Sequence, residues 1–300
     1  RWMNTDVKNK LALIWVAQDM SERRFTYGQL NDEVSKFANG LKSLGVKKGD
    51  KVTIYLPRIP EQFIAMLACL KIGAVHSVVF SGFSADALKN RVEDAQARIV
   101  ICSNSYPYGK KIVDKKKNVD EALKENKTVE HVIIVDRLKN KTGKTHPQDM
   151  FLEELVVKQS TECKTESMES SDPAFILYTS GSTGKPKGII HGHGGYQVGI
   201  YATMKYVFDI KPDDIYWCTA DGGWITGHSY IVYSPLMNGV TTFVYEGTPD
   251  FPDIEIWWRL IDKYKITKFY TAPTAVRALM KFGEEHIKKY DLLTLKVLGS

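Results

Sequence analysis

The sequence has few cysteines and no long apolar run. Its 4 cysteines among 300 residues lie far apart and form no CxxC pair, so neither a disulfide framework nor a zinc site is indicated. No apolar stretch approaches the ~20 residues of a membrane-spanning helix, and the first ten residues do not have the pattern of a signal peptide. We therefore expect a cytoplasmic protein with reduced thiols and no membrane partner.

A strong charge of one sign is also missing. The net charge of +6 comes from 41 lysines and arginines against 35 acidic residues, and much of the excess lies in the lysines between 110 and 117. No aromatic RNA-binding motif or zinc-finger spacing accompanies these lysines, so no nucleic-acid partner is indicated. Small anionic ligands fit the charge better, whereas the oligomeric state stays open.

The apolar residues alternate between helical and strand spacing. From Leu30 to Leu44 they recur every three or four residues, which predicts a helix that ends near Gly45. A β-rich run at 51–57, a second helix ending at Gly73 and an apolar strand at 74–80 follow. This βαβ order predicts an α/β fold in which helices cover layered parallel sheets.

The same alternation continues to the end of the chain. Further strands are expected at 97–103, 131–136, 174–180, 214–220, 241–247, 266–272 and 296–300. The polar stretches within 137–172 lack apolar periodicity, so we place the boundary between two α/β subdomains there. The start looks cut, because Arg1 is not a natural initiator. Because the sequence stops directly after a strand, we interpret it as truncated at the C-terminus.

The motif with the most chemistry is YTSGSTGKPKG at residues 178–188, where a strand leads into glycines, hydroxyl side chains and two lysines. Glycines let backbone N–H groups approach a polyanion. The motif is not a Walker A loop, because Gly181 and Gly184 are too close together and Pro186 follows the lysine. It is not a hydrolase elbow either, because Tyr178 replaces the required first glycine. We predict a phosphate-binding loop of another kind.

This motif resembles the signature loop of the adenylate-forming superfamily. Segments 41–57, 61–88, 219–247 and 270–279 also resemble AMP-forming acetyl-CoA synthetases and their short-chain relatives. The resemblance implies that residues 1–300 are most of the large N-terminal adenylation domain, without the small C-terminal lid domain. It implies an acyl-CoA ligase that activates a short-chain acid, acetate first, with ATP and Mg²⁺, releases pyrophosphate and transfers the acyl group to coenzyme A.

The resemblance also assigns residues to three ligands. The phosphates of ATP would contact Thr179, Ser180, Gly181, Ser182, Thr183, Gly184, Lys185 and Lys187. The acyl pocket would contain Trp224, Ile225, Thr226 and Gly227, although Trp224 and the neighbouring His228 would equally suit a protein core. Gly222, where relatives often have a bulkier residue, would widen that pocket. Coenzyme A would contact Phe80, Ser81, Gly82 and Lys111, with Tyr108 at a position where relatives tend to have a basic residue.

Other features of the family are absent or open. Its adenine contacts, a magnesium-binding glutamate and the catalytic lysine would follow residue 300, so no catalytic residue or metal ligand is assigned within the chain. The segment 270–273 resembles a motif beside the active site, but Pro273 also suits the start of any helix. Alternatives are the same chemistry on propionate, a branched acid or a 3-oxo acid, and a non-catalytic nucleotide-binding relative.

Overall fold

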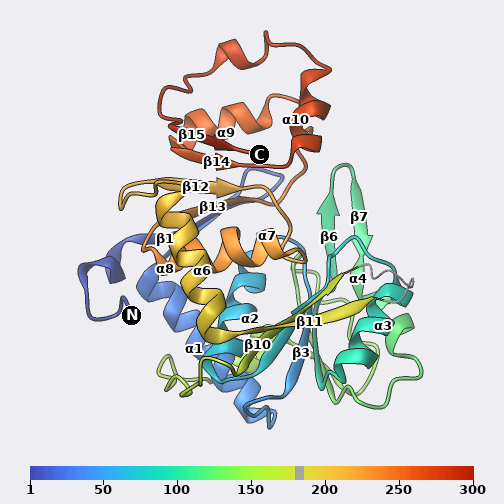
Figure 1. Cartoon of the computed structure of the whole chain (residues 1–300). Coiled ribbons are helices and arrows are strands. Elements are labelled where there is room, and N and C mark those ends of the chain that lie inside the picture. The colour runs from blue at the N-terminus through green and yellow to red at the C-terminus, as the bar shows by residue number, and fades with distance from the viewer. Residues whose placement is uncertain (180–185) are drawn as a thin grey trace.

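A computed structural model describes residues 1–179 and 186–300 (Figure 1). In these two ranges the strands form two large sheets and a small hairpin sheet. The six-stranded sheet has the order β15-β14-β12-β13-β1-β2, and the seven-stranded sheet has the order β11-β10-β4-β3-β5-β8-β9. Apart from β2 and β11, neighbouring strands in both sheets pair in parallel. The prediction of an α/β fold with layered parallel sheets is confirmed.

The elements have the following bounds. The six-stranded sheet contains β1 (Leu11–Val16), β2 (Glu22–Thr26), β12 (Ile215–Cys218), β13 (Thr241–Tyr245), β14 (Lys268–Tyr270) and β15 (Val297–Gly299). The seven-stranded sheet contains β3 (Lys51–Tyr55), β4 (Val75–Val78), β5 (Ile99–Ser103), β8 (His131–Val135), β9 (Asp149–Phe151), β10 (Pro173–Thr179) and β11 (Lys187–Gly192). The hairpin pairs β6 (Ser105–Tyr108) with β7 (Lys111–Asp114). The α-helices are α1 (Tyr27–Ser43), α2 (Pro60–Lys71), α3 (Ala85–Ala95), α4 (Lys115–Leu123), α5 (Leu152–Val156), α6 (His193–Tyr206), α7 (Ile225–Gly227), α8 (Ser234–Met237), α9 (Ile256–Tyr264) and α10 (Pro273–Met280). Shorter turns are η1 (Asp6–Asn9), the π-helical η2 (His228–Tyr233) and η3 (Ile287–Lys289).

The seven-stranded sheet is covered by helices on both faces. Strand β5 shows why, since its alternate residues enter different cores. Ile99 and Ile101 pack into the core that α1 and α2 share, and Val100 and Cys102 pack into the core that α3 and α4 form. A strand buried on both faces reads as a continuous apolar run, which is the pattern of residues 97–103 in the sequence.

Local signals set the ends of the predicted helices. Helix α1 begins after Thr26, whose side chain accepts from the backbone of Gln29 while the Gln29 side chain accepts from the Thr26 N–H, a capping box. Helix α2 begins at Pro60. Both helices are followed by a glycine in the left-handed region, Gly45 at φ +79° and Gly73 at φ +71°, as the sequence predicted.

The six-stranded sheet unites distant parts of the chain. Strand β1 pairs with β13, so residues near the start of the chain lie inside a sheet built mostly from residues after 214. Helices α9 and α10 lie on the face of this sheet that is turned away from the seven-stranded sheet (Figure 1). No helix in the described ranges is long and apolar enough to cross a membrane.

The segment 137–172 does not mark the change from one sheet to the other. Strands β8 and β9, which precede or interrupt it, and β10, which follows it, all belong to the seven-stranded sheet. The chain instead changes sheets between β2 and β3 and again between β11 and β12. A boundary between two subdomains at 137–172 stays a prediction, because sheet membership gives it no support.

Candidate functional site

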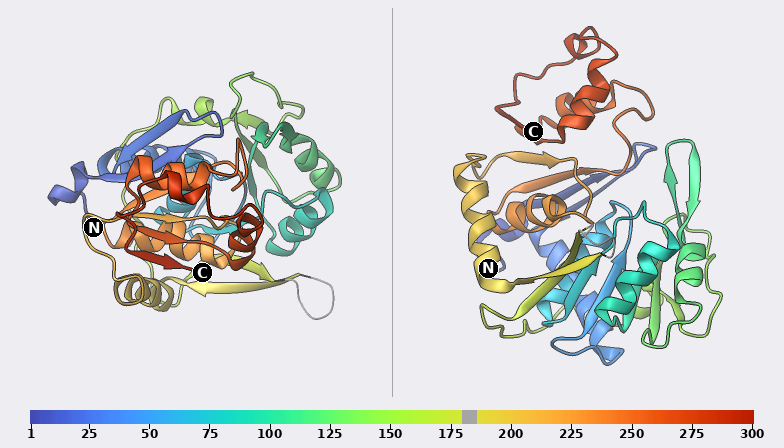
Figure 2. Two further views of the ribbon diagram at one scale, coloured as in Figure 1. Left: turned by 90° about the horizontal axis from the view of Figure 1, so that it is seen from above. Right: turned by 45° about the vertical axis from the view of Figure 1, so that its right-hand side comes forward.

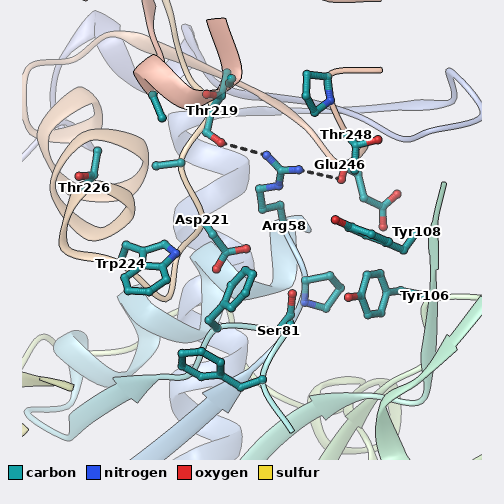
Figure 3. A pocket seen from close by; sticks show the side chains of 18 of the residues that line it. Arg58, Ser81, Tyr106, Tyr108, Thr219, Asp221, Trp224, Thr226, Glu246 and Thr248 are labelled. Atoms are coloured by element: carbon teal, nitrogen blue, oxygen red, sulfur yellow. Dashed lines mark hydrogen bonds between the residues drawn. The ribbon is translucent and has the colours of Figure 1, made fainter. Parts of the chain in front are cut away.

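A large cavity lies where the carboxyl ends of strands from both sheets meet. It has a volume of about 1230 Å³. Its walls come from the residues that directly follow β3, β4, β12, β13 and β14, together with the hairpin β6–β7 and helix α4. Ligands of open α/β sheets bind outside the carboxyl ends of the strands. The topology therefore identifies this cavity as the candidate site (Figure 3).

Two segments predicted to bind different ligands meet in this cavity. Phe80, Ser81 and Gly82, at the end of β4, line it beside Trp224 and Thr226, which come from the turn after β12. The ring centroids of Phe80 and Trp224 are 5.9 Å apart. The predicted coenzyme A and acyl segments are thus neighbours in space although about 140 residues separate them in the sequence.

A glycine lets these two segments approach each other. A Cβ atom at Gly223 would lie 2.6 Å from the backbone N and Cα atoms of Phe80. Backbone atoms cannot move aside as the end of a side chain can, so a side chain at residue 223 would push the two segments apart. The backbones of Gly223 and Phe80 are therefore in close contact beside the cavity.

Ile225 and Gly227, which were predicted to belong to the acyl pocket, do not line the cavity, and neither does the nearby Gly222. Ile225 is exposed, and Gly227 is buried where a Cβ atom would meet the carbonyl of Asp221. A Cβ atom at Gly222 would meet the side-chain amide of Gln62 at 2.4 Å. The expectation that Gly222 widens the acyl pocket is wrong for this cavity, because a side chain there would face Gln62 instead.

The lysine predicted to meet coenzyme A lies outside the cavity. Lys111 is exposed on β7, the outer strand of the hairpin, whereas Tyr108 on β6 lines the cavity. Among the described residues, the cations that line it are instead Arg58, after β3, and Lys115, at the start of α4. Residues 270–273, to which no chemistry was assigned, also line the cavity.

The signature motif connects two paired strands. Thr179, the last residue of β10, is opposite Lys187, the first residue of β11. Tyr178 is anchored by its hydroxyl, which donates to Asp94 at 2.6 Å. The predicted ligands Ser180, Gly181, Ser182, Thr183, Gly184 and Lys185 lie outside the described residues.

Arg58 joins the ends of three strands around the cavity. Its guanidinium donates to the backbone carbonyls of Thr219 at 3.1 Å and Glu246 at 3.3 Å (Figure 3). It also donates to the Gly247 carbonyl at 2.7 Å. Arg58 follows β3 of the seven-stranded sheet, and its acceptors follow β12 and β13 of the six-stranded sheet. One side chain thereby fixes the two sheets relative to each other at the cavity.

Asp221 places a carboxylate in the cavity wall next to Trp224 (Figure 3). One carboxylate oxygen accepts from the Gly223 N–H at 2.8 Å. Burial raises the pKa of Asp221, and the Gly223 hydrogen bond and the charges of Arg58 and Lys115 oppose that shift. Asp221 therefore contributes a desolvated acceptor to a cavity that also holds two basic side chains.

His228 was weighed as core filling, and its surroundings are those of a core residue. Its ring stacks on Phe175 of β10 at 4.6 Å and on His76 at 5.6 Å, and its Nδ1 atom lies 3.1 Å from the Trp224 carbonyl. Burial lowers the pKa of His228 to about 4, so the ring is neutral near pH 7. It positions the turn that bears Trp224 and does not reach the cavity.

Arg58, Asp221, Lys115 and Glu246 were missed by the sequence analysis. Arg58, Asp221 and Glu246 each come one to three residues after a strand of the structure. Arg58 and Asp221 also directly follow the predicted strands 51–57 and 214–220, so the rule that ligands bind at carboxyl ends of parallel strands could have found these two. Glu246 falls inside the predicted strand 241–247. Lys115 was obscured by its neighbours, because it stands in a run of three lysines that reads as a solvated face. No group of three or more His, Cys, Asp and Glu residues suited to a metal occurs in the parts of the chain that the structure describes.

The chain belongs to the AMP-binding enzyme family, whose model matches residues 1–300. Acetyl-coenzyme A synthetase of Leptospira biflexa is 53% identical over 100% of this chain and 47% of its own length. The enzyme of the same name from Methanothrix thermoacetophila is 51% identical over 98% of this chain and 45% of its own.

A solved structure shows the same arrangement. Acetoacetyl-CoA synthetase from Streptomyces lividans has a TM-score of 0.89 at 28% sequence identity, covering 97% of this chain and 44% of that protein. The chain thus spans about half the length of the relatives that it matches. The predicted family is confirmed.

Proposed function

We propose that this chain is the nucleotide-binding and acid-binding part of an AMP-forming acyl-CoA ligase. Such an enzyme joins a carboxylate oxygen to the α-phosphorus of ATP, releases pyrophosphate, and transfers the acyl group from AMP to the thiol of coenzyme A. The observation that carries the proposal is the cavity between the sheets, because the segments proposed for coenzyme A and for the acid both line it. Sequential acyl transfer needs these two ligands side by side.

The phosphate-binding role stays with the signature loop. Thr179 and Lys187 hold its two ends at the edge of the seven-stranded sheet, and the loop between them would bind the leaving phosphates through backbone N–H groups, hydroxyls and lysine charge. Mg²⁺ would enter as the ATP complex, a substrate. The ligands Ser180 to Lys185 are proposed on the motif alone.

Acetate is the acid that we propose first. Its support is the relatives named acetyl-coenzyme A synthetase, which are about 50% identical to this chain. The structural neighbour named acetoacetyl-CoA synthetase supports a 3-oxo acid as a second candidate, at 28% identity. Trp224 and Thr226 in the cavity wall would limit the size of the acid, while Ile225 and Gly227 would shape the turn that bears them.

Isotope exchange between pyrophosphate and ATP tests the proposal. The full-length gene product is assayed with acetate, propionate, isobutyrate and acetoacetate in the absence of coenzyme A. We expect exchange that depends on the acid and on Mg²⁺ and is fastest with acetate. No exchange with any acid would support the alternative of a non-catalytic nucleotide-binding relative. Exchange without any acid would contradict the proposed attack of a carboxylate on the α-phosphorus.

A matched pair of variants tests the loop. Replacing Lys187 by Met is expected to slow exchange by roughly 10²-fold, the usual effect of removing one charge-stabilising donor. Replacing the exposed Lys205 on α6 by Met changes net charge equally and should leave the rate within about twofold. Equal exchange rates for the two variants would show that Lys187 does not bind the phosphates.

A further inference from the structure

Lys115 is a buried cation whose hydrogen-bond acceptors are neutral. Only 2% of its surface is exposed. Its Nζ atom donates to the Tyr55 hydroxyl at 2.9 Å and to the Ser81 carbonyl, and it lies 4.6 Å from the Tyr55 ring centroid. Among the described residues no carboxylate lies within ion-pair distance of it. An ammonium has three N–H donors, so one remains after the acceptors found among the described residues.

The neighbouring lysine shows what a structurally paired cation looks like in this helix. Lys116 is equally buried, but its Nζ atom forms ion pairs with Asp149 at 2.8 Å and with Asp120. Burial of a charge is costly unless an opposite charge is close. Lys116 has that compensation from its own chain, and Lys115 does not.

The unpaired charge of Lys115 faces the candidate site. Lys115 and Ser81 both line the cavity, and Tyr106 borders it on the hairpin side. The carboxylate of Asp221 is the charge that most opposes the effect of burial on Lys115, but it acts from beyond ion-pair distance. Burial lowers the pKa of Lys115 to about 8, so the site holds a cation that a nearby anion would stabilise.

We propose that Lys115 binds a phosphate group of the coenzyme A nucleotide in this cavity, in place of the exposed Lys111. This inference rests on the proposed function. A phosphate oxygen beside Nζ would accept the third N–H as a charge-assisted hydrogen bond and would offset the cost of burying the ammonium. Lys111, on the outer strand of the hairpin, keeps its charge in water and gains little from an anion there.

Calorimetric titration of the full-length gene product with coenzyme A tests the assignment without any turnover. Replacing Lys115 by Met preserves the length of the side chain and removes its charge. We expect the Kd for coenzyme A to rise roughly 10-fold or more, the usual size of one hydrogen bond to a charged group. Lys115→Arg should recover part of the affinity, and Lys111→Met should stay within about twofold of the wild type.

Titration with dephospho-coenzyme A identifies the phosphate. If Lys115 binds the 3′-phosphate, Lys115→Met and the wild type have the same Kd for this analogue. If Lys115 binds the pyrophosphate, the Kd for the analogue rises in Lys115→Met as it does for coenzyme A. An unchanged Kd in a folded Lys115→Met protein, or a larger loss in Lys111→Met, would overturn the assignment. Pyrophosphate exchange does not use coenzyme A, so its absence in the wild type would refute the proposed function instead.

Discussion

At the scale of single residues, the cavity combines charges that burial disfavours. Asp221 has a raised pKa and Lys115 a lowered one, both because of desolvation first. Both shifts favour the neutral forms, because burial disfavours a charge that has no close opposite charge. The residues that carry these shifts come from opposite sheets, Asp221 after β12 and Lys115 at the start of α4.

The pKa of Lys115 makes a prediction about stability. Its folded pKa of about 8 is below the ordinary 10.5, so between these values the unfolded chain binds more protons and stability rises with pH. The free energy of unfolding of the wild type relative to Lys115→Met should therefore increase between pH 8 and pH 10.5, by up to about 3 kcal/mol. Below pH 8 the difference should stay level.

Urea unfolding of both proteins across this range measures the difference, because groups common to both cancel. Lys110→Met, at an exposed residue of the hairpin turn, is the control and should show no such rise. A relative stability that falls with pH would mean that Lys115 already has a partner that stabilises its charge.

Trp224 carries a second prediction, on acid selection. Its side chain borders the cavity and contacts Phe80 and Phe83, with ring centroids 5.9 and 6.3 Å away. Replacing it by Ala should enlarge the acid site, and each accommodated methylene is worth about 1 to 3 kcal/mol. The ratio of exchange rates with butyrate and acetate should rise roughly 10-fold.

Ile225→Ala is the matched variant, because Ile225 directly follows Trp224 in the chain but does not line the cavity. The sequence alone predicts that it forms the wall, whereas the geometry predicts a smaller change in the rate ratio than for Trp224→Ala. A larger change in the rate ratio for Ile225→Ala than for Trp224→Ala would show that Ile225 forms the wall of the acid site.

Sequence reasoning located the site segments better than the side chains. The match of 219–247 to relatives identified the turn that bears Trp224, but it could not tell that Ile225 faces away or that Gly222 faces Gln62. Side-chain direction in an irregular turn depends on contacts with distant segments, here β4 and α2, and no local pattern encodes these. Lys111 was chosen because the resemblance places it near a basic position of the relatives, and the burial of Lys115 cannot be read from a run of lysines.

At the scale of elements, the turn between β12 and α7 is fitted against the end of β4. Gly223→Ala would place a Cβ atom 2.6 Å from the backbone of Phe80, and we expect it to destabilise the protein by about 2 kcal/mol or more through this clash. The Kd for coenzyme A should rise as well, because Ser81 and Gly82 follow Phe80 directly. Thermal unfolding and titration check both effects.

Gly199→Ala is the control for the loss of backbone freedom in the unfolded chain that any replacement of glycine by alanine causes. Gly199 lies inside α6, and a Cβ atom there would have no neighbour within 4 Å, so alanine should stabilise the helix by about 1 kcal/mol. The two substitutions are chemically identical and should change the melting temperature in opposite directions. An unchanged melting temperature in Gly223→Ala would show that the two segments are free to separate.

At the scale of the whole molecule, the two large sheets lie one above the other, as the right-hand view of Figure 2 shows. Among the described residues, Arg58 and Arg137 link these sheets. Arg58 binds three backbone carbonyls, and Arg137, after β8, forms a two-pronged ion pair with Glu246, after β13, at 2.9 and 2.6 Å. Burial raises the pKa of Glu246, and its hydrogen bond with Arg137 opposes the shift. Both links cross from the seven-stranded to the six-stranded sheet.

Replacing Arg137 by Met should leave the buried Glu246 carboxylate without its partner. We expect a loss of about 3 to 5 kcal/mol in the free energy of unfolding. Replacing Arg24, whose pair with Glu22 is half exposed, by Met should change it by less than about 1 kcal/mol. Denaturant unfolding of both variants measures the difference, and equal losses would show that the link between the sheets contributes little.

The topology was only partly predictable from the sequence. The βαβ units at 51–103 followed from periodicity, because local apolar spacing specifies each element. The pairing of β1 with β13 joins residues more than 200 positions apart, and the polar segment 137–172 interrupts one sheet without ending it. Such long-range pairings depend on which sheet edge is open, and the apolar pattern of a strand is the same in either sheet.

The most direct test of the central claim is the identity of the nucleotide product. The full-length gene product is incubated with ATP, Mg²⁺, acetate and coenzyme A, and adenine nucleotides and thioester are quantified together. An adenylating ligase yields AMP and acetyl-CoA in equal amounts, with no AMP when acetate is omitted. Formation of ADP, or of AMP without a matching amount of thioester, would contradict the account.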